Sequence, residues 1–93
     1  MITDHGEIIR IYSDDTHGSR HQRFVVRLKT GQTILILHNI DIAKRIPIRI
    51  GDRIEFRGEY EFNDKGGLVH WTHHCPRGEH DPGWIEHAGI SYS

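Results

Sequence analysis

Residues 53–62 are the most regular stretch of the chain, because apolar and charged residues alternate along RIEFRGEYEF. A period of two is typical of a β-strand with one buried face. The side chains predicted to point inward are those of Ile54, Phe56, Tyr60 and Phe62. Gly58 lies on the same inward row, where a missing side chain permits the bend or bulge that closes a small barrel. We therefore expect an all-β fold.

The remaining apolar runs predict further strands, each bounded by turn residues. These strands are expected at residues 7–12, 21–29, 32–38 and 68–73, with a final hairpin at 84–87 and 90–92. Asn39 is a suitable N-cap for a short helix over residues 40–46, which Pro47 would end. Three strands, a short helix and two strands follow the order of an OB-like β-barrel. The alternative is a small open sandwich of the same strands.

The chain has 93 residues, which is enough for one domain with a small core. We expect an OB-like barrel over residues 1–74 and an irregular, histidine-rich extension over residues 75–93 that packs on it. No stretch approaches the roughly 20 apolar residues that a membrane helix needs. A membrane is therefore not an expected partner.

Charge is unevenly divided although the net charge is only −1. Residues 1–50 carry eight Lys and Arg against five Asp and Glu, whereas residues 51–93 carry four against eight. The first half therefore contains a candidate basic face. The sequence pI of about 6.7 is far from the strongly basic value that marks many nucleic-acid-binding domains.

Histidine is concentrated near the C-terminus, where residues 63–87 hold five of the nine histidines together with the only cysteine. Imidazole and thiolate are ligands for divalent transition metals, and zinc is the metal expected here. On a strand, His70 and His74 would lie about 13 Å apart, so one ion cannot bind both. The predicted ligands are His73, His74 and His80, with Cys75 and His87 next. The alternative is that these histidines are hydrogen-bonded structural groups, which we favour for His70.

A binding surface without catalysis is a further hypothesis. OB barrels bind single-stranded nucleic acids or oligosaccharides across their second and third strands and the adjoining loops. Candidate ligand-binding residues on and near that surface are Arg20, His21, Arg23, His38, Lys65 and Trp71. Arg27 and Lys29 continue the basic row, and Tyr60 is a second aromatic that a base could stack on.

Catalysis is the third class of function. A metal-assisted phosphodiesterase or nuclease would need a metal or general base beside phosphate-binding cations. His38, Asp41, His73 and His74, with Arg20 and Arg23, are the residues that would supply them. The chain contains no known hydrolase motif, so the sequence favours a binding protein over an enzyme.

Several strings of the chain, taken together, resemble a family of small bacterial proteins catalogued as a domain of unknown function. They are GSRHQRF, HNID, GEYE, NDKGG, HWTHH and GWIEH. The resemblance covers nearly the whole chain and implies an OB-like barrel, but no activity. Cys75 stands where the family pattern has Asp, and Ala88-Gly89 where it has Asn-Gly.

A single cysteine cannot form an internal disulfide, which predicts a reducing cytoplasm. Residues 1–10 also lack the basic head and apolar stretch of a secretory leader. The family resemblance points the other way, because relatives often carry an export leader. An exported, periplasmic location is therefore the alternative.

Overall fold

The structure is a computed structural model that describes residues 1–93 and contains strands but no helix. The strands are β1 (Ile2–Asp15), β2 (His21–Leu28), β3 (Thr33–Asn39), β4 (Arg53–Glu61), β5 (Leu68–His70), β6 (Trp84–His87) and β7 (Ile90–Tyr92). The predicted all-β fold is confirmed.

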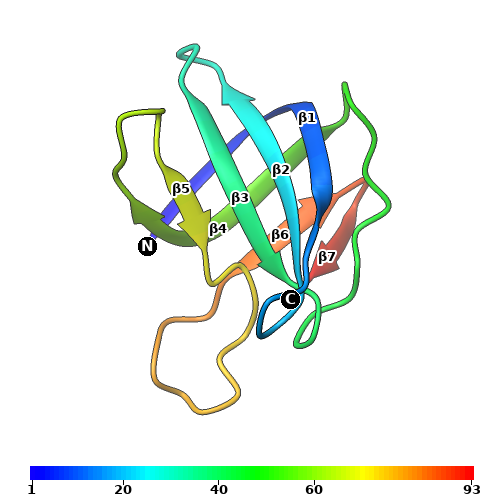
Figure 1. Cartoon of the computed structure of the whole chain (residues 1–93), viewed down its shortest axis with the longest axis vertical. Coiled ribbons are helices and arrows are strands. Elements are labelled where there is room, and N and C mark those ends of the chain that lie inside the picture. The colour runs from blue at the N-terminus through cyan, green and yellow to red at the C-terminus, as the bar shows by residue number, and fades with distance from the viewer.

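Five strands close into a ring, because β1 pairs with β2 along one edge and with β4 along the other. The order around the ring is β1, β2, β3, β5, β4. Every pairing is antiparallel except that of β3 with β5. Figure 1 shows β1, β2 and β3 side by side, with β4 crossing behind them. The β6–β7 hairpin then extends the sheet from β4.

Strand β1 is longer than the predicted residues 7–12, since it begins at Ile2 and ends at Asp15. Its first half pairs with β4, and the pairing passes to β2 at Gly6 and Glu7. The register with β2 shifts between Ile8 and Arg10 and again beyond Tyr12. Such bulges bend a strand, which lets one strand serve two partners.

The core is made by the inward rows of the ring strands, together with Ile46 from the loop after β3 and Ile85 from β6. Its buried members are Ile8, Phe24, Val26, Leu28, Ile34, Ile36, Ile46, Ile54, Phe56, Val69 and Ile85. Burial alternates along β2 and β4, which places Phe24 and Phe56 inside. Ring closure therefore follows from period-two patterning on strands that bury one face.

The predicted helix over residues 40–46 is wrong, although Asn39 does begin a turn there. The Asn39 Oδ1 accepts from the Asp41 N–H at 2.9 Å, and Ala43 N–H donates to the Asn39 carbonyl at 3.0 Å. No second turn follows, because the buried Gln22 amide binds both backbone groups of Ile46. Pro47 then removes the next donor. A side chain from the sheet thus replaces the bonds that a helix would make.

Two strand details also differ from prediction. Phe62 is 83% exposed rather than inward, because β4 ends at Glu61 and the chain turns there. Strand β5 ends at His70 and not at residue 73, since Trp71 adopts a positive φ of 57°. Residues 71–83 form a long loop without strands, which begins before the predicted irregular segment of residues 75–93.

The C-terminal hairpin has the predicted strands, 84–87 and 90–92. Its two turn residues, Ala88 and Gly89, have φ angles of 51° and 80°. Positive φ at both central positions is what a two-residue type I′ turn requires. Asn-Gly, the pair in the family pattern, adopts this geometry more readily than Ala-Gly does.

Candidate functional site

One end of the ring brings together three loops, residues 16–20, 40–46 and 71–83, which meet at the bottom of the view in Figure 1. A pocket of about 360 Å³ opens among them. Its lining residues are His21, Asn39, Ile42, His70, Trp71, His73, Cys75, Pro76, Arg77, Glu79 and His80. We call this the polar-end pocket.

His38 lies beneath the polar-end pocket and is completely buried. Its Nε2 lies 3.3 Å from the Lys44 carbonyl, which can only accept, so Nε2 carries the hydrogen. Nδ1 then accepts from the Thr72 hydroxyl at 2.7 Å. Burial lowers the pKa of His38 from 6.5 to about 4. His38 is therefore a neutral structural group, and both of its nitrogens are occupied.

Arg20 and Asp41 join the first two loops. Asp41 accepts the Arg20 backbone N–H at 2.8 Å and the Arg20 Nε–H at 2.9 Å. These two bonds hold the pKa of the Asp41 carboxyl below its ordinary value. Because Arg20 already pairs with Asp41, little of the positive charge of Arg20 is left to attract a ligand.

Three imidazoles on the polar-end pocket share one tautomer. The Nδ1 atoms of His21, His73 and His80 donate to the carbonyls of Ser19, His74 and Asp81 at 2.9, 2.5 and 2.6 Å. A ring that donates from Nδ1 keeps the lone pair of Nε2 free. Burial lowers the pKa of His73, so its ring is neutral near pH 7.

Cys75 begins a tight loop on the same pocket. Desolvation alone would raise the pKa of its thiol, but the backbone N–H groups of residues 77–80 face the sulfur and together lower that pKa. One of them, the Glu79 N–H, lies 3.1 Å from Sγ. The loop thus favours a thiolate, the form that binds soft metals.

The five predicted metal ligands are only partly brought together. His73, Cys75 and His80 line the polar-end pocket, and the His74 ring lies 6.5 Å from that of His73. His87 lies elsewhere, on β6, where its Nε2 is 2.7 Å from Asp52 Oδ2. No three His, Cys, Asp or Glu side chains form a group that could hold a metal ion. Zinc binding stays a prediction.

The aromatic and histidine side chains around the pocket are largely occupied by one another. Trp71 stacks on His80 with ring centroids 4.3 Å apart. His70 Nε2 is 3.0 Å from Glu61 Oε1, at ion-pair distance but outside hydrogen-bond geometry. Tyr60, outside this pocket, is partly buried and donates its hydroxyl to the Gly66 carbonyl at 3.1 Å.

A second hollow, of about 580 Å³, lies on the outer face of β1, β2 and β3. We call it the outer groove. Its lining residues are Ile9, Arg10, Tyr12, Arg23, Val25, Thr33, Leu35, Asn63, Lys65 and Gly67. Three are cations and none is Asp, Glu, His or Cys. Neither Arg10, Arg23 nor Lys65 forms an ion pair, so the positive charge of the groove is not neutralised.

Tyr12 forms the aromatic part of the outer groove. The guanidinium carbons of Arg10 and Arg23 lie 5.1 and 5.7 Å from the centre of its ring. Arg23 is also anchored, because its Nε–H donates to the Ser13 carbonyl at 2.9 Å. Two guanidinium groups at one aromatic ring create a concentrated positive site at the end of β1.

The loop of residues 62–67 places Lys65 at the edge of the outer groove. Asn63 Oδ1 accepts the backbone N–H groups of Lys65 and Gly67, both at 2.9 Å. Gly66 has a φ of 111°, and a Cβ there would lie 2.1 Å from the Thr33 carbonyl oxygen. The sequence NDKGG therefore fixes this loop against β3.

Comparison with known proteins decides the family. The family model described as "Protein of unknown function (DUF3465)" matches residues 1–93. The chain belongs to this family. No curated protein and no solved structure matches it. This DUF3465 chain has no helix long and apolar enough to cross a membrane.

Of the ligand-binding residues predicted for this DUF3465 protein, Arg23 and Lys65 line the outer groove. His21 and Trp71 line the polar-end pocket instead, whereas Arg20 is paired and His38 is buried. A ligand role for these residues stays a prediction. The two sets lie at different places on the molecule, so the structure contains two candidate sites.

Sequence reasoning missed Arg10, Tyr12 and Phe62. The bulge after Ile8 turns Arg10 and Tyr12 to the outer face beside Val25 and Arg23. Nothing in the string EIIRIY marks that bulge, because its residues are mostly apolar. For Phe62 a signal existed: the turn residues Asn63 and Asp64 follow it directly, which favours an end to the strand.

Proposed function

We propose that this protein is an OB-like module that binds single-stranded nucleic acid across the outer groove. The strand order supports the OB-like part, since the closed ring β1-β2-β3-β5-β4 has one parallel pairing, between β3 and β5. OB folds bind ligands on the face of strands 2 and 3, beside the loops after strands 1 and 4. The outer groove lies on that face, and the loop of residues 62–67 follows β4.

One observation carries the proposal: Arg10, Arg23 and Lys65 converge on a groove without a single carboxylate. In a chain with a net charge of −1, unpaired cations gathered in one hollow are a local feature and not a consequence of overall composition. Cations that track a phosphate backbone provide most of the affinity of proteins that bind single strands without sequence preference.

Exposed aromatic residues favour single-stranded nucleic acid over other polyanions. Tyr12 is 40% exposed within the groove, and the 83% exposed Phe62 directly precedes Asn63 of the groove wall. Bases stack on such rings, and every base has a face that can stack. In a duplex the faces of the bases are covered, so a groove with cations, the partly exposed Tyr12 and the exposed Phe62 fits an unpaired strand better.

Binding without catalysis fits the groove better than hydrolysis does. Its lining contains no imidazole, carboxylate or thiol to act as a general base or as a metal ligand. The histidines and the cysteine lie at the polar-end pocket instead. A phosphodiester held in the outer groove would therefore meet cations and an aromatic ring but no catalytic group.

Fluorescence anisotropy with a labelled single-stranded oligonucleotide tests the proposal. The variant Arg10→Gln/Arg23→Gln removes two groove cations, and Lys44→Gln/Arg49→Gln removes two exposed cations outside the groove. We expect the first pair to weaken binding strongly and the second to weaken it little. Equal losses, or tighter binding of a duplex or a sulfated oligosaccharide than of the single strand, would overturn the proposal.

A further inference from the structure

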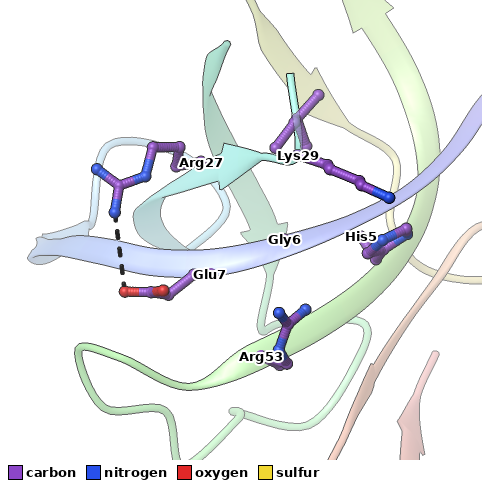
Figure 2. A pocket seen from close by; sticks show the side chains of 7 residues that line it. His5, Gly6, Glu7, Arg27, Lys29 and Arg53 are labelled. Atoms are coloured by element: carbon purple, nitrogen blue, oxygen red, sulfur yellow. Dashed lines mark ion pairs between the residues drawn. The ribbon is translucent and has the colours of Figure 1, made fainter. Parts of the chain in front are cut away.

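A third hollow, of about 370 Å³, lies where β1 passes from one partner strand to the other. Its lining residues are His5, Gly6, Glu7, Arg27, Leu28, Lys29 and Arg53. We call it the Gly6 pocket. In Figure 2 the ion pair of Arg27 and Glu7 lies at one end of the pocket, the side chains of Lys29 and His5 lie at the other, and Arg53 is drawn between them.

The strand pairing explains why these cations meet. Gly6 is the partner of Leu28 on β2 and of Ile54 on β4, so the end of β2 and the start of β4 lie on its two sides. The approach is close, because a Cβ on Gly6 would lie 2.4 Å from the Arg27 carbonyl oxygen. Only glycine permits this crossing, which carries Lys29 and Arg53 into one pocket.

The pocket has uncompensated positive charge. Glu7 pairs with Arg27 at 4.0 Å, and His5 lies 3.8 Å from Asp4. Lys29 and Arg53 form no ion pair. Two free cations suit a phosphomonoester, which carries a charge of about −1.5 to −2 and three acceptor oxygens near pH 7. A phosphodiester carries only one negative charge, so one cation is enough to balance it.

The Gly6 pocket and the outer groove both lie along β1 and β2. On β2, Arg23 and Val25 line the groove and Arg27 lines the pocket, and Lys29 of the pocket follows in the turn after β2. At about 3.3 Å per step, the four steps along β2 from Arg23 to Arg27 span roughly 13 Å, and Lys29 lies beyond them. One extended chain of phosphates can therefore follow β2 from the groove into the pocket.

The charge changes sign just beyond this pocket. Glu55 on β4 lies directly opposite Glu86 on β6, and both line a neighbouring hollow that Arg53 and His5 also line. A strand that continued in that direction would meet two carboxylates, which repel phosphate. The cationic track thus ends at Arg53 and Lys29.

We infer that the Gly6 pocket binds the terminal phosphomonoester of the single strand that the outer groove holds. This inference rests on the proposed function. The phosphate enters between Lys29 and Arg53, and the chain leads away from it along β2 toward Arg23. The shared chemistry is a phosphomonoester at a strand end, and either the 5′ or the 3′ end can provide it.

Anisotropy titrations with three versions of one oligonucleotide test the inference: a 5′-phosphate, a 3′-phosphate and hydroxyls at both ends. We expect one phosphorylated strand to bind about tenfold more tightly than the hydroxyl strand, the effect of hydrogen bonds to a charged group. Lys29→Gln/Arg53→Gln should abolish that preference, so that the three strands bind this variant with equal affinity. The groove variant Arg10→Gln/Arg23→Gln should weaken all three strands and keep the preference.

The possible failures can be told apart. If the wild-type protein binds the strand equally well with and without a terminal phosphate, the inference is wrong and the proposed function stands. If no strand binds at all, the proposed function fails, and a nuclear magnetic resonance titration of the Gly6 amide with inorganic phosphate then tests the pocket alone. No shift of that amide, or the same shift in Lys29→Gln/Arg53→Gln, would overturn the pocket itself.

Discussion

Thr72 donates its hydroxyl hydrogen to Nδ1 of His38 across 2.7 Å, inside the end of the ring where the three loops meet. This bond requires that Nδ1 be unprotonated. Together with burial, this bond favours the neutral form of the His38 ring in the folded protein. The bond joins the motif HNID, which begins at His38, to the motif HWTHH, which contains Thr72. It also makes the stability of the fold depend on pH.

The first prediction is a loss of stability in mild acid. His38 has a pKa of about 4 in the folded protein and 6.5 in the unfolded chain, so the unfolded chain binds the proton first as pH falls. The contribution of His38 to the free energy of unfolding should be constant above about pH 7 and should fall by up to about 3 kcal/mol between pH 6.5 and 4. Urea titrations across this range measure it.

The matched control is His38→Gln. Its amide can still accept from Thr72 and donate to the Lys44 carbonyl, but it does not titrate. Most of the slope between pH 6.5 and 4 should disappear in this variant, apart from a smaller contribution of the same sign from His73. Identical pH profiles for the two proteins would show that His38 is not the group responsible.

The second prediction concerns Thr72 itself, which is completely buried. Thr72→Val keeps the shape of the side chain and leaves Nδ1 of His38 without a donor, at a cost of about 1–3 kcal/mol in the free energy of unfolding. Thr72→Ser keeps the hydroxyl and should cost less than the valine variant. Denaturant unfolding at pH 7.5 separates them, and a valine variant as stable as wild type would rule out the bond as a source of stability.

The third prediction compares two glycines with positive φ. Gly66→Ala would place a Cβ 2.1 Å from the Thr33 backbone oxygen, whereas a Cβ on Gly78 would meet nothing within 4 Å. Gly78→Ala should cost about 1–2 kcal/mol, the left-handed backbone penalty alone. Gly66→Ala should cost clearly more and should also weaken strand binding, because the loop carrying Lys65 must move. Equal unfolding energies for the two variants would contradict this.

The fourth prediction separates stability from binding at Phe62. Because this ring is 83% exposed, Phe62→Ala should change the free energy of unfolding by less than about 0.5 kcal/mol. If a base stacks on it, strand affinity should fall by about 5- to 150-fold, which corresponds to roughly 1–3 kcal/mol. Ile50→Ala removes another exposed apolar side chain, 67% exposed and outside the groove, and should leave affinity unchanged. If Phe62→Ala and Ile50→Ala bind the strand with equal affinity, Phe62 does not contact the bound strand.

Much of the fold is predictable from local pattern. The strands predicted at residues 21–29 and 53–62 are present at 21–28 and 53–61, and Phe62 is the one predicted inward residue that is exposed. Ala88-Gly89 marked the final turn. The helix over residues 40–46 failed because a distant side chain, Gln22, binds the backbone of Ile46. No pattern within seven residues contains that information.

The candidate site was predictable only in part, for a similar reason. Arg23 and Lys65 were expected on the binding face, whereas Arg10 and Tyr12 reach it through a bulge that the sequence does not mark. Clustering in sequence also does not bring all the predicted metal ligands to one place. His87 lies close to the other histidines along the chain, but β6 carries it to Asp52 instead.

The salt dependence of strand binding tests the central claim most directly. Each phosphate contact made by a cation contributes about −0.7 to the slope of log K against log salt concentration for a single strand. Arg10→Gln/Arg23→Gln should therefore make the slope about 1.4 units shallower than in the wild-type protein, and Lys44→Gln/Arg49→Gln should leave it unchanged. A wild-type slope near zero, or one that the groove variant leaves unaltered, would contradict the account.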